Sequence, residues 1–278
     1  MFKNILVPVD GSNYQISQVN HAIELARIYN AKITALFVVD IKIVEGPMLR
    51  DLSFLSETLT NFEYHNEVKN SLEEKGAAAL EKIKEICAAG NISCECRVVP
   101  GIIANTIAET AKLADIIILG KRGENANFGG EFLGSSAENA TRLSNKPVMV
   151  VEENYRAIKK MMFAYDGSAS ANKALQVVAD LTLAAKLELS VITVYDDETE
   201  GKQILSEAVS YLNSYNITPA EILKSGDVVD TIISEANETG SDLIMMGAYG
   251  HSAFQQMLLG STTTLLIRAA RMPVLLYR

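Results

Sequence analysis

The sequence has no surplus of positive charge, no long apolar run and little cysteine or histidine. Its net charge is −9, and both halves share it: residues 1–152 carry 15 basic and 19 acidic side chains, and residues 153–278 carry 10 and 15. Acidic halves disfavour nucleic acid or an anionic membrane as the main partner. No segment approaches the roughly 18 continuous apolar residues of a membrane span, and the N-terminus lacks a signal-peptide pattern. We therefore expect a cytoplasmic protein that binds neither nucleic acid nor membrane.

The three cysteines do not form a metal-binding pattern. Ile92, Cys94, Cys96 and Val98 occupy every second position of an expected strand, so both thiols share one apolar face of it. No histidine or further cysteine lies near enough in the sequence to complete a four-ligand site. We expect core thiols, with Cys87 packed near them, and no metal-binding residues.

What the sequence does contain is a repeat of three blocks in the same order. A repeat of this kind indicates two copies of one module of roughly 140 residues, a size that can bury an ordinary core. We expect domains at residues 1–152 and 157–278. The matched blocks are residues 5–12 and 161–168, residues 120–123 with 133–135 and 247–250 with 259–261, and residues 145–150 and 270–275.

Short apolar runs alternate with amphipathic helical patterns in both copies. Strands are expected near residues 4–9, 33–39, 93–99, 115–120 and 148–151, and near 159–165, 189–195, 218–223, 242–247 and 273–277. Such runs are typical of buried parallel strands, and their alternation with helices implies right-handed crossovers. The predicted fold class is α/β, with two tandem doubly wound domains that each contain a five-stranded parallel sheet.

The first copy has an insert of 29 residues between its second strand and its long helix, at about residues 40–65. We expect the long helix over residues 66–89. The insert is apolar, so part of it should be helical and fold over a neighbouring surface. Its large apolar residues are Met48, Leu49, Leu52, Phe54, Leu55, Leu59 and Phe62.

The Gly-rich block is the most specific local motif. In the second copy it reads Gly247-x-x-Gly250, nine further residues, and then Gly260-Ser261-Thr262. Glycines let the backbone approach a ligand closely, and free N–H groups at a helix start attract anions. The block lacks a Walker lysine, and no Gly-x-Gly-x-x-Gly follows the first strand. It predicts a phosphate-binding loop, although glycines alone would also suit turns and a helix cap.

An aspartate ends the first strand of each copy. Asp10 and Asp166 fall on the carboxyl edge, where parallel sheets bind ligands, but both would also suit a cap on the following turn. Among the histidines, His251 lies in the second Gly-rich loop, where contact with phosphate and simple exposure are both open. His21 and His65 are expected to be surface or partly packed residues rather than ligands.

Together, the strand-one aspartate, the Gly-x-x-Gly-x9-Gly-Ser block and the Pro-Val last strand resemble the universal stress protein family. Two copies resemble its tandem members, and the resemblance covers nearly the whole chain apart from the insert and residues 152–158. It implies a Rossmann-like fold of the adenine nucleotide alpha hydrolase type. It also implies binding of ATP, or alternatively AMP or ADP, often with Mg²⁺ beside the phosphates.

In the second copy the family motif is complete. The resemblance implies nucleoside contacts from Asp166 and from the backbone of Val194, and contacts to ribose and phosphates from the Gly-rich block. The residues implied there are Gly247, Gly250, Gly260, Ser261 and Thr262.

The first copy departs from the motif, with ten residues rather than nine between Gly123 and Gly134. The extra residue shifts the amides, and two glutamates in that segment would repel a triphosphate unless Mg²⁺ intervenes. Lys121 and Arg122, which are positively charged, would instead attract the triphosphate. The resemblance implies a second, weaker site here, formed by Asp10, Val38, Gly120, Gly123, Gly134 and Ser135.

No catalytic constellation is apparent. A Gly-x-Ser-x-Gly elbow is absent, and the second Gly-rich loop has no lysine or arginine between Gly247 and Gly260, although fast phosphoryl transfer needs cations on the developing charge. We expect no dedicated enzyme, with slow ATP turnover left open.

Two functions follow as hypotheses. One is an ATP-binding universal stress protein that acts as a nucleotide-dependent regulator in the stress response. The alternative is a nucleotide-independent interaction or protective module that binds an unknown protein through the apolar insert. The last strands of the family commonly pair, so the chain would be either a pseudo-dimeric monomer or a homodimer.

Overall fold

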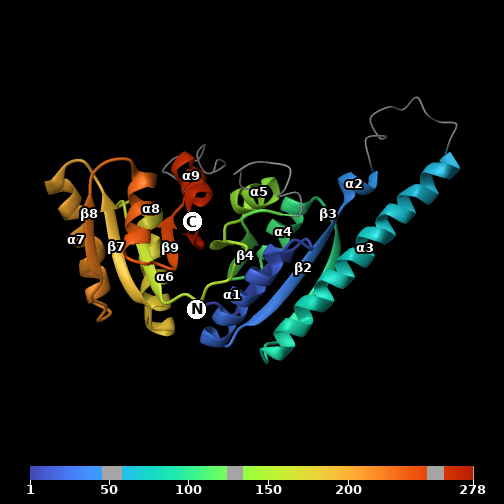
Figure 1. Ribbon diagram of the computed structural model, residues 1–278, viewed down its shortest axis with the longest axis horizontal. Coiled ribbons are helices and arrows are strands. Elements are labelled where there is room, and N and C mark those ends of the chain that lie inside the picture. Colours follow the sequence, from blue (N-terminus) through green and yellow to red (C-terminus); the bar gives the residue numbers. More distant parts are fainter. Residues whose placement is uncertain (46–57, 124–133, 249–259, 278) are drawn as a thin grey trace.

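Both copies fold into alternating strands and helices (Figure 1). The computed structural model describes residues 1–45, 58–123, 134–248 and 260–277. The first copy contains β1 (Asn4–Val9), α1 (Tyr14–Tyr29), β2 (Lys32–Asp40), α2 (Ile41–Glu45), α3 (Thr58–Ala89), β3 (Cys94–Gly101), α4 (Ile103–Ala111), β4 (Ile116–Gly120), α5 (Ser135–Leu143) and β5 (Val148–Val151). The second contains β6 (Lys160–Ala164), α6 (Ala169–Ala185), β7 (Glu188–Val194), α7 (Glu198–Asn213), β8 (Ala220–Lys224), α8 (Val228–Glu238), β9 (Leu243–Gly247), α9 (Ser261–Ala269) and β10 (Val274–Tyr277).

The predicted strands agree with the observed ones to within two residues at each end. Most central strands are apolar and buried on both faces, as β1 and β5 are, which is why short continuous apolar runs identified them. The two copies also share their local geometry. Asn30 after α1 and Lys186 after α6 both take the left-handed conformation, with φ of 50° and 54°, and end their helices at matching positions.

The two copies share a single ten-stranded sheet rather than forming two separate five-stranded sheets. Its order is β3-β2-β1-β4-β5-β10-β9-β6-β7-β8, and every neighbouring pair is parallel except β5 and β10. The α/β fold class is thus confirmed, while the expected strand count applies to each copy and not to the sheet.

The antiparallel β5–β10 pair places a local two-fold axis at the centre of the sheet. Met149 pairs with Leu275, and these two residues hold equivalent positions in the repeat. On either side of this centre, Val150 pairs with Val274 and Val148 pairs with Leu276. Val148 corresponds to Val274 in the repeat and Val150 to Leu276, so the two-fold axis relates one pair to the other. The chain therefore contains the pseudo-dimer that the repeat made conceivable.

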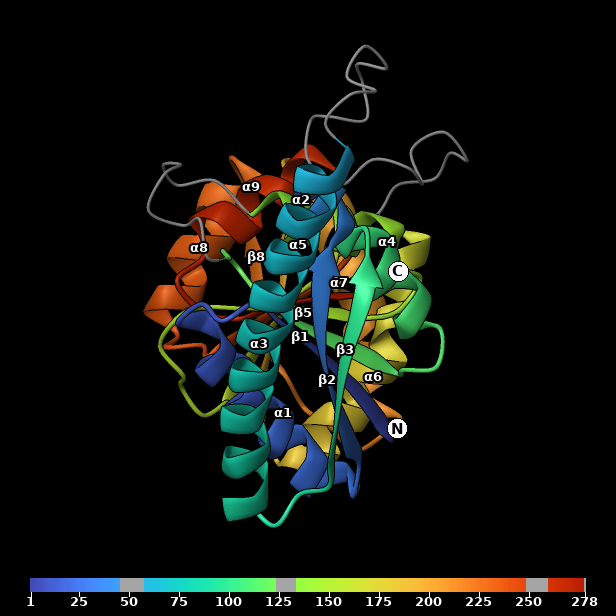
Figure 2. The same cartoon turned by 90° about the vertical axis from the view of Figure 1, so that its right-hand side faces the viewer.

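Helices cover both faces of the sheet (Figure 2). α1, α3, α6 and α7 pack on one face, and α4, α5, α8 and α9 pack on the other. Each face has one apolar core that runs through both copies. The copies also touch directly where the Tyr29 hydroxyl of α1 donates to Asp180 Oδ2 of α6 at 2.7 Å.

The long helix of the first copy begins earlier than expected. It was predicted over residues 66–89, but α3 starts at Thr58 and has 32 residues. The insert is therefore helical at residues 41–45 and 58–65, as expected for part of it. Its segment 46–57 lies outside the described residues, so its expected packing on a neighbouring surface stays a prediction.

The three thiols gather between the end of α3 and β3. Cys87 is fully buried, whereas Cys94 and Cys96 are half-buried because β3 is the edge strand of the sheet. The hydrogen bond with Cys87, followed by burial, raises the pKa of Cys94. Within the described ranges, no three His, Cys, Asp or Glu side chains are arranged to hold a metal ion. No helix in this part of the chain is long and apolar enough to cross a membrane.

His21 corrects the expectation of a surface residue. It lies on α1 and is only 1% exposed. Its ring is 4.8 Å from that of Tyr155, in the connection between the copies, and its Nδ1 is 3.7 Å from Glu24 Oε2. Tyr155, which helps to cover His21, lies far along the chain in the connection between the copies.

Candidate functional site

The turn after the first strand has the same geometry in both copies. Asp10 Oδ1 accepts from the Ser12 N–H at 3.0 Å, and Asp166 Oδ1 accepts from the Ser168 N–H at 2.9 Å. The intervening glycines have φ of +89° and +73°, a region that favours glycine. Each aspartate thus caps its turn through Oδ1, as the capping interpretation expected.

Strands β1 and β4 separate toward this edge. Their ladder stops at Leu6, because Pro8 has no N–H to donate. The buried Gln18 amide on α1 instead donates to the carbonyls of Pro8 at 2.7 Å and Ile118 at 3.1 Å. The sheet order reverses between β1 and β4, so this is the crevice where such folds bind ligands.

In the first copy, the structure brings four of the predicted residues together. A Cβ placed on Gly123 would lie 2.6 Å from Asp10 Oδ2, so a side chain there would displace the Asp10 carboxylate. The Gly134 N–H donates to the Lys121 carbonyl at 3.0 Å, which brings the start of α5 back onto the Gly-rich block. Gly120 is pressed against Tyr14, where a Cβ would approach the Tyr14 Cβ to 2.7 Å. Ser135 follows as the first residue of α5.

In the second copy, the described part of the block is equally tight at its start. A Cβ on Gly247 would meet the Ala171 N at 2.5 Å, so β9 ends directly against α6. At Gly260 the nearest atom would be Thr263 Oγ1 at 3.6 Å, which is an ordinary contact. Gly250 and His251 lie outside the described residues, so their predicted roles stay predictions.

Helix α9 begins differently from the other helices of the second copy. Ser168, Asp197 and Asp227 each cap their helix by accepting a backbone N–H into the side chain. α9 begins after Gly260, which supplies no such bond, and its first turn contains no acidic residue. Ser261 is exposed and Thr262 half-exposed at this start. The first N–H groups of α9 are thus available to an anion.

Helix α5 of the first copy also begins after a glycine without a side-chain cap. Its first turn, however, carries Glu138. A carboxylate near a helix N-terminus is itself an anion in the helix field and competes with a second one. This difference agrees with the expectation of a weaker first site.

The two valines implied at the nucleoside hold matching places. Val38 lies one residue beyond Phe37, the last β2 residue paired with β1. Val194 is the last residue of β7 and pairs with Lys224 of β8. Both side chains are half-buried, and both backbones reach the carboxyl edge.

The Lys121 side chain is held by partners outside the predicted phosphate site. The residue is only 7% exposed. The ammonium instead contacts Glu152 Oε1 at 2.7 Å and donates to the Ala270 carbonyl at 2.7 Å. The expectation that it would attract phosphate was wrong, because a partner distant in sequence holds it. Arg122 remains beside the loop, half-buried.

Two residues near the first site had no sequence signal. Lys75 of α3 reaches the strand-one turn, where its Cε is 3.3 Å from the Cβ position of Gly11. Tyr14 lies against Gly120, and burial followed by the Glu152 carboxylate raises its pKa. Neither belongs to the repeated blocks, so only the packing of α1 and α3 on the sheet reveals them.

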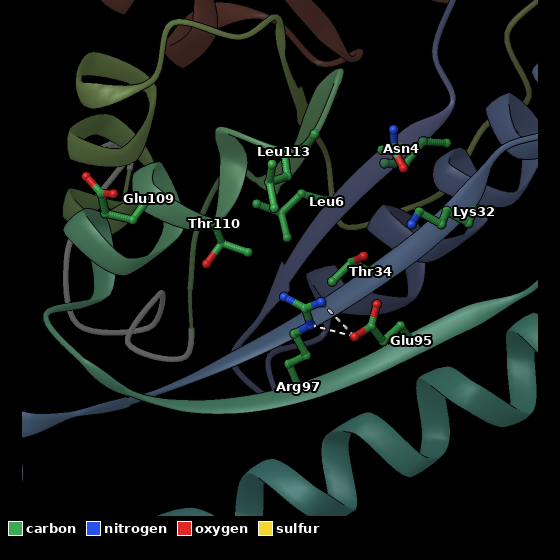
Figure 3. A pocket seen from close by; sticks show the side chains of 11 residues that line it. Asn4, Leu6, Lys32, Thr34, Glu95, Arg97, Glu109, Thr110 and Leu113 are labelled. Atoms are coloured by element: carbon green, nitrogen blue, oxygen red, sulfur yellow. Dashed lines mark hydrogen bonds and ion pairs between the residues drawn. The ribbon is translucent and has the colours of Figure 1, made fainter.

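A cavity of about 330 Å³ lies at the opposite end of the first copy (Figure 3). Asn4, Lys32 and Thr34 line it from the amino halves of β1 and β2. Arg97 and Glu95 of β3 point into it and are paired with each other at 2.7 Å. This cavity is separate from the carboxyl edge and shares no residue with the predicted site.

These features define a tandem α/β protein that carries, in each copy, a Gly-rich block at the carboxyl ends of its parallel strands. The family model for the universal stress protein family matches residues 1–152 and 157–278. Universal stress protein Slr1230 from Synechocystis sp. is 31% identical over 286 aligned residues, which span 99% of this chain and 100% of that protein. Universal stress protein MJ0531 from Methanocaldococcus jannaschii is 30% identical over 156 residues, or 55% of this chain and 84% of its own.

Among solved structures, a universal stress protein from Archaeoglobus fulgidus DSM 4304 superposes with a TM-score of 0.77. The two chains are 22% identical, and the match covers 98% of this chain and 95% of the other. The chain therefore belongs to the universal stress protein family, as a member with two copies of the domain.

Proposed function

We propose that the protein binds ATP at the carboxyl edge of the second copy and acts as a nucleotide-dependent regulator in the stress response. The observation that carries the proposal is the start of α9. Of the four helices that the structure describes in that copy, α9 is the one that begins at a glycine, Gly260, with neither a side-chain cap nor an acidic first turn. An uncapped helix start beside two hydroxyls suits phosphate oxygens.

The nucleoside would lie along the crevice toward β6 and β7, against Asp166 and the backbone of Val194. The free carboxylate oxygen of Asp166 suits a ribose hydroxyl, which is a hydrogen-bond donor. Mg²⁺ would lie on the phosphate oxygens and keep most of its waters, so it requires no cluster of protein carboxylates. An adenine base is part of this proposal and is supported by the resemblance to the family.

The proposed role is binding rather than fast catalysis. The described residues around Gly247 and Gly260 include no lysine or arginine directed at the phosphate position. Stabilising the developing charge of phosphoryl transfer normally needs such cations. Slow hydrolysis would require no more than the bound nucleotide and water.

The test is calorimetric titration of nucleotide-stripped protein with Mg-ATP, using Gly260→Glu and the isosteric control Gly260→Gln. Gly260 has φ of −56° and room for a Cβ, so both variants should fold. We expect the glutamate to weaken binding by at least about tenfold, because its carboxylate competes with phosphate at the helix start, and the glutamine to weaken it less.

The outcomes separate the two hypotheses. Unchanged affinity in Gly260→Glu would show that the cradle lies elsewhere. Gly134→Glu in the first copy should cost less affinity, and equal losses would indicate two working sites. If Mg-ATP does not bind the native protein at all, the regulator proposal fails. The interaction module that uses the insert would then be the function to examine.

A further inference from the structure

Lys121 joins parts of the protein that are far apart in sequence. Its ammonium is held between Glu152, at the start of the connection, and the carbonyl of Ala270. Ala270 is the C-cap of α9, and its own N–H donates to the Leu266 carbonyl. A cation at the C-terminal end of a helix is favoured by the exposed carbonyls and by the helix dipole. The buried ammonium thus anchors the end of α9 to the first copy.

The main chain of Lys121 belongs to the first Gly-rich loop. Its N–H donates to the Val151 carbonyl at 2.9 Å, and its carbonyl accepts from the Gly134 N–H at 3.0 Å. Gly134 is the N-cap of α5, where phosphate would bind in the first copy. One residue therefore contacts the end of α9 with its side chain and the start of α5 with its backbone.

The matching positions of the second copy lack this connection. Lys121 corresponds to Ala248, which is buried and has no side-chain donor. The C-cap of α5 is Ser144, whose hydroxyl accepts locally from the Lys146 N–H at 3.0 Å. The internal two-fold symmetry is broken here: a side chain of the first copy contacts the end of α9, and the matching residue of the second copy makes no such contact with the end of α5.

We propose that Lys121 couples α9 to the start of α5, so that a nucleotide at the start of α9 changes the backbone around Lys121 and Gly134. This inference rests on the proposed function. α9 has nine residues, about 13 Å, and a single short helix moves as a rigid unit. Phosphate binding at Gly260 and the ammonium at Ala270 act on opposite ends of that unit. Any shift of α9 is thereby passed to the residue that holds Gly134.

The test is hydrogen exchange in the Gly134→Glu background, in which the second copy holds the remaining nucleotide site. Exchange is followed at Lys121, Arg122 and α5, with and without Mg-ATP, while calorimetry confirms occupancy. We expect the nucleotide to change exchange at these amides by about fivefold or more, within the usual range of coupling between sites. Adding Lys121→Met should abolish this nucleotide-dependent change.

Two further variants separate coupling from general damage. Lys112→Met removes the same charge from an exposed ion pair on α4, with 68% of the lysine side chain accessible, and should leave the response intact. Glu152→Gln keeps an acceptor for Lys121 but removes its charge, and should reduce the response without abolishing it. The readout is the difference made by the nucleotide, which a merely structural role would not alter.

Nucleotide binding with no response in the first copy, or an equal response in Lys121→Met, would overturn the coupling and leave the proposed function standing. Absence of nucleotide binding in the Gly134→Glu protein would overturn both the coupling and the proposed function.

Discussion

At the scale of single residues, the two copies differ in how the backbone carbonyls at the carboxyl end of their first strand are hydrogen-bonded. Pro8 ends the β1–β4 ladder, and the amide of Gln18 satisfies the two carbonyls left without a strand partner. In the second copy the corresponding residues are Ala164 and Ala174, and the β6–β9 ladder continues through Ala164. A proline in a central strand thus comes with a buried amide on the neighbouring helix, and the alanine copy needs neither.

We predict that Gln18→Ala lowers the free energy of unfolding by about 1–3 kcal/mol, because it leaves buried carbonyls unpaired. Adding Pro8→Ala should restore most of that loss by supplying the missing N–H, as Ala164 does in the second copy. Chemical denaturation of the two single variants and the double variant measures this coupling. Additive losses in the double variant would contradict the pairing.

The same scale explains why part of the site was predictable and part was not. Asp10, Asp166 and the glycines could be identified because their roles depend on local backbone geometry, which the repeat shows twice. The partner of Lys121 lies 149 positions away, so no local pattern could give its direction. His21 was misjudged for the same reason, since the connection that buries it follows 134 positions later at Tyr155.

At the scale of elements, the joint between β6 and α6 depends on a buried tyrosine. Tyr165 follows β6, is 2% exposed, and its hydroxyl donates to Asn172 Oδ1 of α6 at 2.6 Å. Burial, and then the charges of Glu207 and Asp166, raise the pKa of Tyr165 to about 12 from its usual 10. As the pH rises, the unfolded chain therefore loses the Tyr165 hydroxyl proton at a lower pH than the folded protein does.

The stabilisation from this tyrosine is complete below about pH 10 and is lost as the pH rises toward about 12. We predict that the free energy of unfolding falls over that interval and that Tyr165→Phe makes the fall shallower, although the variant is less stable at neutral pH because it lacks the hydrogen bond. Denaturation curves at pH 8 to 12 provide the measurement. Equal slopes in the two proteins would mean that Tyr165 titrates normally in the folded state.

Helix boundaries show the limit of sequence periodicity at this scale. The bounds of β5 were predicted to the residue, and Pro147 marks its start. The start of α3 was placed eight residues late, since no glycine or proline between Thr58 and residue 66 marks a boundary. Where neither residue type interrupts the chain, a helix extends as far as packing allows.

At the scale of the whole molecule, the β5–β10 pair turns two domains into one sheet. Both strands are apolar, four residues long and buried on both faces apart from the last residue of β10. Their register is self-complementary, because Met149 meets its own counterpart Leu275. An unpaired β5 would therefore present an edge that another copy of the same strand can pair with.

We predict that residues 1–152 expressed alone form a symmetric dimer through β5, with antiparallel pairing centred on Met149. Sedimentation equilibrium of this fragment beside the full chain measures the association. Replacing Val150 with proline, which cannot donate to the new ladder, should shift the fragment toward monomer. A fragment that stays monomeric as its concentration rises would show that β5–β10 pairing depends on contacts specific to the second copy.

The sequence by itself determined the repeat, the α/β class, nearly all strand positions and, in each copy, the strand ends that carry the aspartate turn and the Gly-rich block. These features follow from short-range periodicity and from glycine and proline, whose backbone effects are local. Only the tertiary structure decided that the copies share one sheet, that Gln18 replaces a missing ladder bond, and that Lys121 leaves the phosphate loop to hold α9. Each of these depends on which distant backbone groups remain unpaired once the chain has folded, and that is a property of the packed molecule.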